Sequence, residues 1–238
     1  MRFYDLEIHS NADEGENTVA EIAKFAETMG YSGIAICDKF ESMEKLRKLK
    51  EEISKMVTTV DVYLGVKIYA ETPEEMRKAI ERVREEVAII IVSGGNYSVN
   101  RAACENSKVD ILIHPELGRV DNGLDEVCLN EAKRNGVAIG INFREILKRY
   151  RRPRSFLLDR IAQNISLCKE INVPIVVCSG AKGIWDMRDP RKLVSITNIF
   201  GMELEKSFAC VSSIPQGIVD NNLKKLRGEK ITEGVELG

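Results

Sequence analysis

Short apolar stretches alternate with amphipathic stretches along almost the whole chain, and this alternation limits the possible folds more than any other feature. β-branched and other apolar residues predict seven strands, at 3–8, 33–37, 62–69, 87–92, 109–113, 137–141 and 174–178. Amphipathic stretches separate most of them, a pattern typical of parallel sheets covered by helices. We therefore expect an α/β fold with about seven parallel strands, either as a closed or nearly closed barrel or as a doubly wound open sheet.

The predicted helices carry recognisable start and stop signals. Thr18 and Glu21 match a capping box, Pro73 suits the first turn of a helix, and Gly136 is a typical residue to end one. Together with the spacing of apolar residues, these signals predict helices at 18–29, 41–55, from 73 onward, near 98–106, 124–134, 155–171, after 189–190, and in the tail to about 227.

The composition is that of a folded protein. Hydrophobic residues make up 44% and charged residues 30% of the 238 residues, which excludes general disorder. No linker rich in proline, glycine or serine divides the chain, so we expect a single domain over residues 1–238. Six cysteines without a Cys-x-x-Cys pair indicate reduced, mostly buried thiols. The chain has neither a signal-peptide pattern nor an apolar run of 18 residues, so we expect a cytoplasmic protein without a membrane partner.

Polar side chains follow the predicted strands at the points where functional groups gather in parallel α/β folds. They are Glu7, His9, Asn11, Asp13, Asp38, Lys39, Lys67, Asn96, His114, Glu116, Arg119, Asn142, Arg144, Lys182, Trp185, Asp186 and Arg188. We interpret them as the rim of a functional site. The alternative is that these residues are polar only because loops are polar.

Residues 144–154 concentrate positive charge in a chain whose net charge is only −2. Six cations against Glu145 give this basic segment a charge of +5, which leaves −7 for the remaining residues. The cations are Arg144, Lys148, Arg149, Arg151, Arg152 and Arg154. Clustered arginines around Tyr150 suit contacts with phosphate and stacking, although a solvated helix and loop is the alternative. The single tryptophan, Trp185, is expected to pack under a loop rather than to form an exposed stacking platform.

The first strand end resembles the opening motif of the polymerase and histidinol phosphatase (PHP) family. That family has a distorted barrel whose histidines and carboxylates hold metal ions for phosphoester hydrolysis. Its opening motif is Asp-x-His-x-His, whereas this chain reads Asp5-Leu-Glu7-Ile-His9, so one histidine is replaced and one is kept. The family's His-Pro step is present as His114-Pro115, and Asp38 matches the aspartate of its Thr-Asp-His step.

Three further positions that hold metal ligands in the PHP family carry lysine in this chain, namely Lys39, Lys67 and Lys182. An ammonium group a few Å from a divalent cation repels it. The resemblance therefore implies a degenerate pocket without a metal cluster, composed of Glu7, His9, Asp38 and His114. We hypothesise that the three lysines bind phosphate directly in place of the lost metal charge.

Three longer segments, at 109–125, 136–147 and 173–193, carry a more specific resemblance. In this order they are similar to ribonuclease P protein component 3, the thirty-kilodalton subunit family of archaeal and eukaryotic ribonuclease P. The similarity extends from Phe3 to at least Pro215, and it includes the motif Ala181-Lys182 followed by Trp185, Asp186 and Arg188.

This resemblance implies a TIM-like (PHP-like) barrel that serves as a non-catalytic subunit of ribonuclease P. In that enzyme the RNA removes 5′ leaders from precursor tRNA. The implied partners are the ribonuclease P RNA, precursor tRNA and a small partner protein. No cofactor is expected on the protein, and magnesium is expected on the RNA. The candidate RNA-binding residues are Lys39, Lys67, Arg119, Arg144, Arg149, Arg151, Arg152, Arg154, Lys182 and Arg188.

Two other functions stay open on the sequence alone. The first is a metal-dependent phosphoesterase of the PHP class, in which His9, Asp38 and His114 would hold a single ion. The second is a structural barrel that tethers the partner protein and barely touches RNA. The sequence does not say which face would meet the RNA and which the partner.

Overall fold

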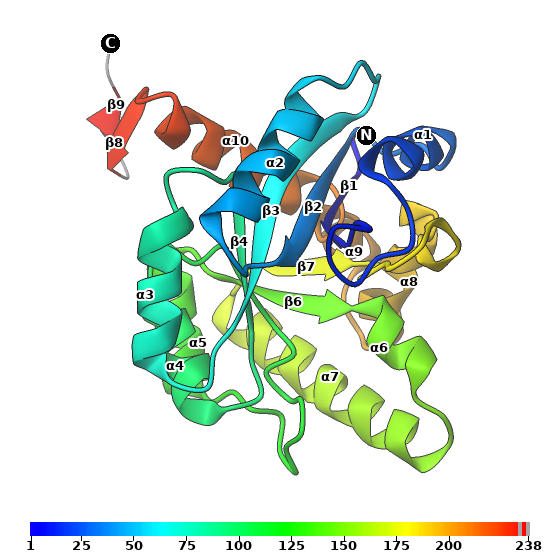
Figure 1. Cartoon of the computed structure of the whole chain (residues 1–238). Coiled ribbons are helices and arrows are strands. Elements are labelled where there is room, and N and C mark those ends of the chain that lie inside the picture. Colours follow the sequence, from blue (N-terminus) through cyan, green and yellow to red (C-terminus); the bar gives the residue numbers. More distant parts are fainter. Residues whose placement is uncertain (233–234, 237–238) are drawn as a thin grey trace.

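Seven strands hydrogen-bond in sequence order into one parallel sheet, and helices lie around it (Figure 1). The computed structural model describes residues 1–232 and 235–236; residues 233–234 and 237–238 of the expected domain lie outside that part. The strands are β1 (Tyr4–Ile8), β2 (Gly33–Lys39), β3 (Asp61–Tyr69), β4 (Ile89–Ser93), β5 (Ile111–Ile113), β6 (Ala138–Asn142) and β7 (Ile175–Cys178). The expected α/β barrel with seven parallel strands is confirmed, and each predicted strand end lies within two residues of the observed one.

The strands are apolar on both faces because each face packs into a hydrophobic cluster. Ile89 and Ile91 of β4 point into the barrel, where they pack with Ile111 of β5. Ile90 and Val92, which alternate with them, pack into the outer cluster beneath the helices. Burial on both faces explains why β4 reads as a continuous apolar run instead of an alternating one.

The barrel closes between β1 and β7 only near their carboxyl ends, where Ile8 and Ala181 form an isolated parallel bridge. Nearer the amino ends, the connection between α9 (Leu204–Ala209) and α10 (Ser213–Leu226) fills the gap. There the Tyr4 amide donates to the Val211 carbonyl (2.9 Å), and the Val177 amide donates to the Cys210 carbonyl (3.1 Å). This connection therefore satisfies hydrogen bonds that an eighth strand would otherwise make.

Helix α10 covers the end of the barrel at which the strands begin. Val219 of α10 packs into the inner cluster. The Asn222 side chain donates to the Ala88 carbonyl (2.9 Å) and to Asp110 (2.7 Å), which also accepts a hydrogen bond from Arg84 (2.8 Å). Because α10 fills this end, the opposite end, where the strands finish, is the one that the loops shape.

The other helices are α1 (Val19–Thr28), α2 (Met43–Ser54), α3 (Pro73–Val83), α4 (Tyr97–Cys104), α5 (Glu126–Asn135), α6 (Phe143–Lys148), α7 (Arg152–Ile171), the short η1 (Ile184–Asp186) and α8 (Pro190–Ile199). The capping box of Thr18 and Glu21 and the left-handed Gly136 (φ 72°) are present as predicted. Helix α6 was not predicted, and α7 begins three residues earlier than expected. Helix α6 spans six residues, too few for a periodic pattern to be recognised. The tail that was predicted as helical to about residue 227 contains α9 and α10. A short antiparallel pair, β8 (Lys230–Thr232) and β9 (Val235–Glu236), follows α10.

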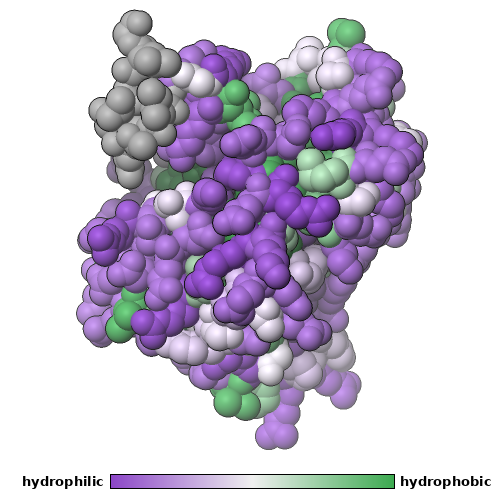
Figure 2. Space-filling view, turned by 60° about the vertical axis from the view of Figure 1, so that its left-hand side comes forward, coloured by the Kyte–Doolittle hydropathy of each residue, from purple (hydrophilic) through white to green (hydrophobic). Residues whose placement is uncertain are grey.

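All six cysteines are buried and unpaired, as the sequence predicts. Within the described residues, we find no helix that is long and apolar enough to cross a membrane. Figure 2 shows a face on which hydrophilic residues predominate and hydrophobic ones form small, separate patches.

Candidate functional site

The strand ends surround a polar cavity of about 100 Å³. Residues of β3, β4 and β6 line it, together with α6 and the loops after β1, β5 and β7. The lining residues include His9, Glu14, Lys67, Tyr69, Ser93, His114, Asn142, Arg144, Glu145, Lys148 and Lys182. The cavity therefore unites six of the predicted rim residues from distant parts of the sequence: His9, Lys67, His114, Asn142, Arg144 and Lys182. A larger cavity, of about 760 Å³, lies at the other end of the barrel beside α10.

A buried ion pair lies at the floor of this strand-end cavity. Lys67 Nζ is 2.6 Å from Glu7 Oε1, and the Asn142 side chain donates to Glu7 Oε2 at 2.8 Å. Glu7 is fully buried and Lys67 is 4% exposed. Burial alone would raise the pKa of Glu7, but the charge and hydrogen bond of Lys67 together with the nearby His114 and His9 outweigh it and hold that pKa below its ordinary value. Burial alone would lower the pKa of Lys67, and the Glu7 carboxylate reverses this effect and raises it.

His114 lies beside this pair and is held in an unusual backbone conformation, with φ 56°. Its side chain is buried, and burial together with the charge of Lys67 lowers the pKa of His114 to about 4. His114 is therefore neutral at physiological pH. It adds no positive charge to the cavity.

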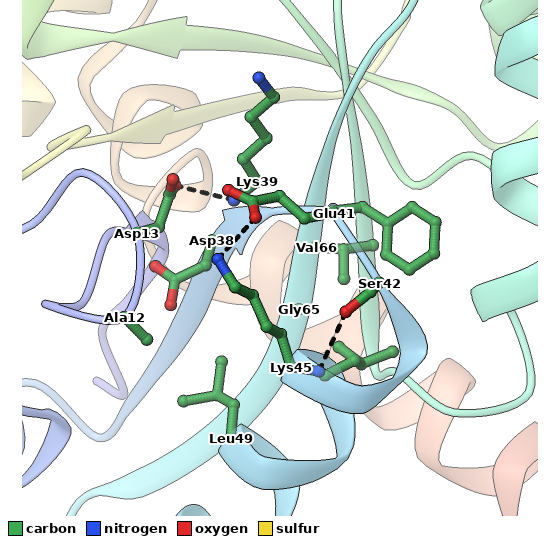
Figure 3. Close-up of a pocket in the computed structure, with 12 residues that line it drawn as sticks. Ala12, Asp13, Asp38, Lys39, Glu41, Ser42, Lys45, Leu49, Gly65 and Val66 are labelled. Carbon is green, nitrogen blue, oxygen red and sulfur yellow. Dashed lines mark hydrogen bonds and ion pairs between the residues drawn. The ribbon is translucent and has the colours of Figure 1, made fainter.

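The hypothesis that three lysines offer unpaired charge to a phosphate needs correction. Lys67 is buried against Glu7, and Lys182 forms an ion pair with Glu14 from the loop after β1. Each ammonium is thus neutralised by an acid that the sequence analysis did not pair with it. Lys39 differs from them. Its backbone amide donates to Asp13 (2.8 Å), and Figure 3 shows its side chain extending away from the Asp13 and Asp38 carboxylates.

His9, Asp13 and Asp38 come close enough for one ligand atom of each to lie within 4.8 Å of the others. Their oxygens, however, already accept protein hydrogen bonds. Asp38 accepts from the Ser10 amide (2.7 Å) and the Ser10 hydroxyl (2.5 Å), and Asp13 accepts from the Lys39 amide. His9 Nε2 is also 4.0 Å from the Glu7 oxygen that Lys67 occupies. This donor set does not fit the clustered ions of a PHP hydrolase, because an ammonium group stands where the next ligand would be needed.

The basic segment forms α6, a short connection and the first turn of α7, and its cations have different surroundings. Arg149 lies 3.7 Å from Glu145, and Arg154 donates to the carbonyls of Arg149 (2.6 Å) and Leu147 (3.1 Å). These two side chains hold the turn between the helices together. Arg151 and Arg152 are exposed, and the Arg151 guanidinium lies over the Tyr150 ring at 5.3 Å.

The remaining predicted cations are tied to neighbouring groups around the rim. Arg119 forms a two-pronged contact with Asp121 (2.5 and 2.8 Å), and Arg144 donates to Asp186 (2.8 Å). Arg188 donates to the Trp185 carbonyl at 2.7 Å. Of the candidate RNA-binding residues, Lys67, Arg144 and Lys182 line the cavity, as does Lys148 of the basic segment. Lys39, Arg119, Arg149, Arg151, Arg152, Arg154 and Arg188 lie outside its lining.

Two further residues at the site were not singled out from the sequence. Tyr69 lines the cavity, and its ring lies 5.4 Å from Lys67 Nζ and 5.7 Å from Lys39 Nζ. It stands two residues after Lys67 on β3 and hence on the same face, a spacing that could have identified it. Glu14 directly follows Asp13, but no local pattern signals that it pairs with Lys182. The expectation that Trp185 packs under a loop was wrong, because its side chain is 79% exposed.

Comparisons with known proteins agree with this arrangement. The profile of the family described as RNase P subunit p30 matches residues 2–227. Ribonuclease P protein component 3 of Methanosarcina mazei is 32% identical, over 92% of this chain and 90% of that protein. The protein of the same name from Methanosarcina acetivorans is 31% identical, over 99% of this chain and 98% of that protein.

Solved structures give the same result. A chain in a cryo-EM structure of archaeal ribonuclease P with mature tRNA superposes with a TM-score of 0.80 at 28% identity, over 98% of this chain and 97% of that chain. Aspergillus niger ochratoxinase superposes with a TM-score of 0.63 at 11% identity, over 90% of this chain and 70% of that chain, and shares the fold alone. The match over nearly the whole length, in profile, sequence and structure, shows that this chain belongs to the RNase P subunit p30 family.

Proposed function

We propose that this chain is a non-catalytic protein subunit of ribonuclease P that binds and stabilises the catalytic RNA through its strand-end face. We define that face as the loops and helix starts that follow the barrel strands. The observation that carries the proposal is the pairing of Lys67 with Glu7 in the place of a metal ion. A lysine at this position does not fit the clustered metal ions of a PHP hydrolase, whereas the same end of the barrel displays arginines that suit phosphate.

Exposed arginines of the basic segment are the leading candidates for RNA contact. Arg151 and Arg152 reach solvent at the start of α7, and Lys148 is also exposed. Cations at such positions displace the counterions condensed on RNA phosphates, and this release favours binding. Cations that sit between RNA helices also lower the repulsion between their phosphates. We infer that the protein reduces the magnesium concentration at which the RNA adopts its active fold.

The proposal assigns the chemistry to other members of the complex. The ribonuclease P RNA would hold magnesium and remove the 5′ leader from precursor tRNA. A small partner protein would complete the assembly with this chain. The relative of known structure comes from an archaeal ribonuclease P with mature tRNA, which supports RNA and a multi-subunit complex as the setting.

The test is cleavage of precursor tRNA by the reconstituted complex across a magnesium titration, with and without this protein and its partner subunit. We expect the complex that contains the protein to reach half of its maximal rate at a lower magnesium concentration. An identical magnesium requirement with and without the protein would contradict the proposal. Hydrolysis of a generic phosphate ester by the purified chain with added manganese would instead favour a phosphoesterase.

A further inference from the structure

Every exposed aromatic side chain among the described residues belongs to the strand-end face. Tyr69 ends β3, Tyr97 begins α4 directly after β4, and Tyr150 and Phe156 follow β6, before and within the first turns of α7. Trp185 lies in η1, after β7. Their exposed fractions range from 37% for Tyr97 to 79% for Trp185. The exposed aromatic residues of the described chain therefore all belong to segments that follow the barrel strands, where RNA binding is proposed.

Cations accompany these rings. The Arg119 guanidinium lies 5.7 Å from the centre of the Tyr97 ring, and the Arg151 guanidinium lies 5.3 Å from that of Tyr150. Exposed aromatic rings beside cations are the combination with which proteins hold single-stranded nucleic acids, since the rings stack on bases while the cations meet phosphates. Such a pair of exposed ring and cation occurs both after β4 and after β6, so one chance substitution cannot account for it.

Trp185 is the most exposed of these rings and sits on a rigid turn. The Ile184 amide donates to the Asn17 side chain (3.0 Å), and the Met187 amide donates to the Ile184 carbonyl (3.2 Å). Met187 is buried and anchors the end of the turn. The indole contacts the Phe25 ring edge-on, at 5.9 Å between centroids and an interplanar angle of 67°. The ring is thus held in place before any ligand arrives, which lowers the entropic cost of binding.

The surroundings of Trp185 are charged rather than apolar. Arg188 donates to the Trp185 carbonyl, and the next residue, Asp186, accepts from Arg144 and from the Lys182 amide. A tryptophan that anchors a protein–protein interface is typically surrounded by side chains that exclude water. Arg188, whose guanidinium is held at the Trp185 carbonyl, is a cation that can meet a phosphate beside the indole. The charges therefore favour a nucleic acid over a protein as the occupant of this site.

We propose that Trp185 stacks on an unpaired nucleobase of RNA, whose flanking phosphate lies toward Arg188. The inference rests on the proposed function and deepens it, because it names a single-stranded segment as what this part of the face binds. Bases within a duplex already stack on their neighbours and leave no free face for the indole. The site is therefore selective for unpaired nucleotides and tolerant of their sequence.

The intrinsic fluorescence of the protein tests this directly, because Trp185 is the only tryptophan in the chain. The full chain is titrated with an unlabelled single-stranded RNA octamer, with the same octamer in which every base is removed, and with an RNA duplex of equal length. Binding of each is measured separately by anisotropy with labelled RNA. We expect the single-stranded octamer to quench the tryptophan emission, and the abasic strand and the duplex to leave it nearly unchanged at equal occupancy.

Substitutions give a second readout. Trp185→Ala is expected to weaken binding of the octamer by about 5- to 100-fold, whereas Trp185→Phe keeps most of the affinity because it keeps an aromatic face. Val57→Ala is the matched control, since Val57 is a fully exposed apolar residue in the loop before β3, at the other end of the barrel. Thermal unfolding of each variant shows whether it folds. The Trp185 variants are expected to fold normally, because the indole packs against little besides Phe25.

Two results would overturn the inference, and they are distinguishable. Octamer binding with unchanged tryptophan emission and with equal affinity in Trp185→Ala would show that RNA binds elsewhere, which leaves the proposed function intact. The absence of binding to every RNA, at low salt and by anisotropy, would overturn the stacking site and the proposed function together.

Discussion

At the scale of single residues, Lys67 and Glu7 form a buried ion pair at positions where the PHP family carries metal ligands. A carboxylate that is fully buried needs a positive charge beside it. In this chain the ammonium of Lys67, on β3, supplies that charge, and the Asn142 side chain donates a hydrogen bond to the second oxygen of Glu7. Because Lys67 is part of the chain, the counter-charge of Glu7 cannot dissociate.

Removal of Lys67 alone is expected to be costly. Lys67→Met leaves Glu7 buried without its counter-charge, and we expect the free energy of unfolding to fall by about 3–5 kcal/mol. The double variant Lys67→Met, Glu7→Gln removes both charges and should recover most of this loss. Urea unfolding of both variants provides the measurement. If the single variant is as stable as the wild type, the pair does not have the role assigned to it.

Glu116 gives a pH-dependent prediction. It is buried at the end of β5, and burial raises its pKa to about 7. Folding raises this pKa, so the unfolded chain releases the proton at a lower pH than the folded protein does. The free energy of unfolding therefore falls as the pH rises from about 4.5 to 7. Glu116→Gln removes that cost. We expect the stability advantage of the variant to grow by about 2 kcal/mol between pH 5.5 and pH 8.

The control for this effect is Glu105→Gln, a substitution of an exposed glutamate on the outer helical layer. Its effect on unfolding by urea should be the same at both pH values. A difference between Glu116→Gln and the wild type that does not change with pH would show that Glu116 has an ordinary pKa in the folded protein.

At the scale of elements, the turn between α6 and α7 combines backbone strain with exposed charge. Arg151 adopts φ 51° and ψ −128°, a region that favours glycine and costs other residues about 1–3 kcal/mol. Arg154 holds the turn closed through the Leu147 and Arg149 carbonyls. The turn therefore places the exposed Arg151 guanidinium at a cost in stability.

Arg151→Gly separates these two properties. Relief of the strain is expected to raise the free energy of unfolding by about 1 kcal/mol. Loss of the cation is expected to reduce the slope of log K against log salt for RNA binding by about 1. Arg152→Gln serves as the comparison, because it should lower the slope without changing stability. If the salt dependence of RNA binding is the same for Arg151→Gly as for the wild type, Arg151 does not contact phosphate.

The elements were more predictable from the sequence than their contacts. The strands were found because burial on both faces leaves apolar runs such as β4, and α3 and α5 were found because Thr72-Pro73 and Gly136 are strong local signals. The residues Glu14 and Lys182 could not be paired, because they lie in different loops and meet only when the barrel closes. The exposure of Trp185 was missed for the same reason, since only the packing of η1 against α1 decides it.

At the scale of the whole molecule, the two ends of the barrel differ in character. The strand-start end is filled by α10 and its hydrogen bonds to Asp110 and Ala88. The strand-end face carries the basic segment and the exposed aromatic rings. The net charge of −2 does not reveal this difference between the two ends, because acidic residues elsewhere in the chain offset the arginines. Bulk composition could therefore not have indicated a nucleic-acid partner, whereas the positions of the charges support the proposed one.

The most direct test of the account compares the salt dependence of RNA affinity for two charge-matched triple variants. One carries Lys148→Gln, Arg151→Gln and Arg152→Gln on the strand-end face. The other carries Lys108→Gln, Lys225→Gln and Arg227→Gln around the cavity and helix end at the opposite side. We predict that the first variant lowers the slope of log K against log salt by about 2 to 3, while the second leaves it unchanged. Equal slopes for the first variant and the wild type, or a loss confined to the second, would contradict the assignment of RNA binding to the strand-end face.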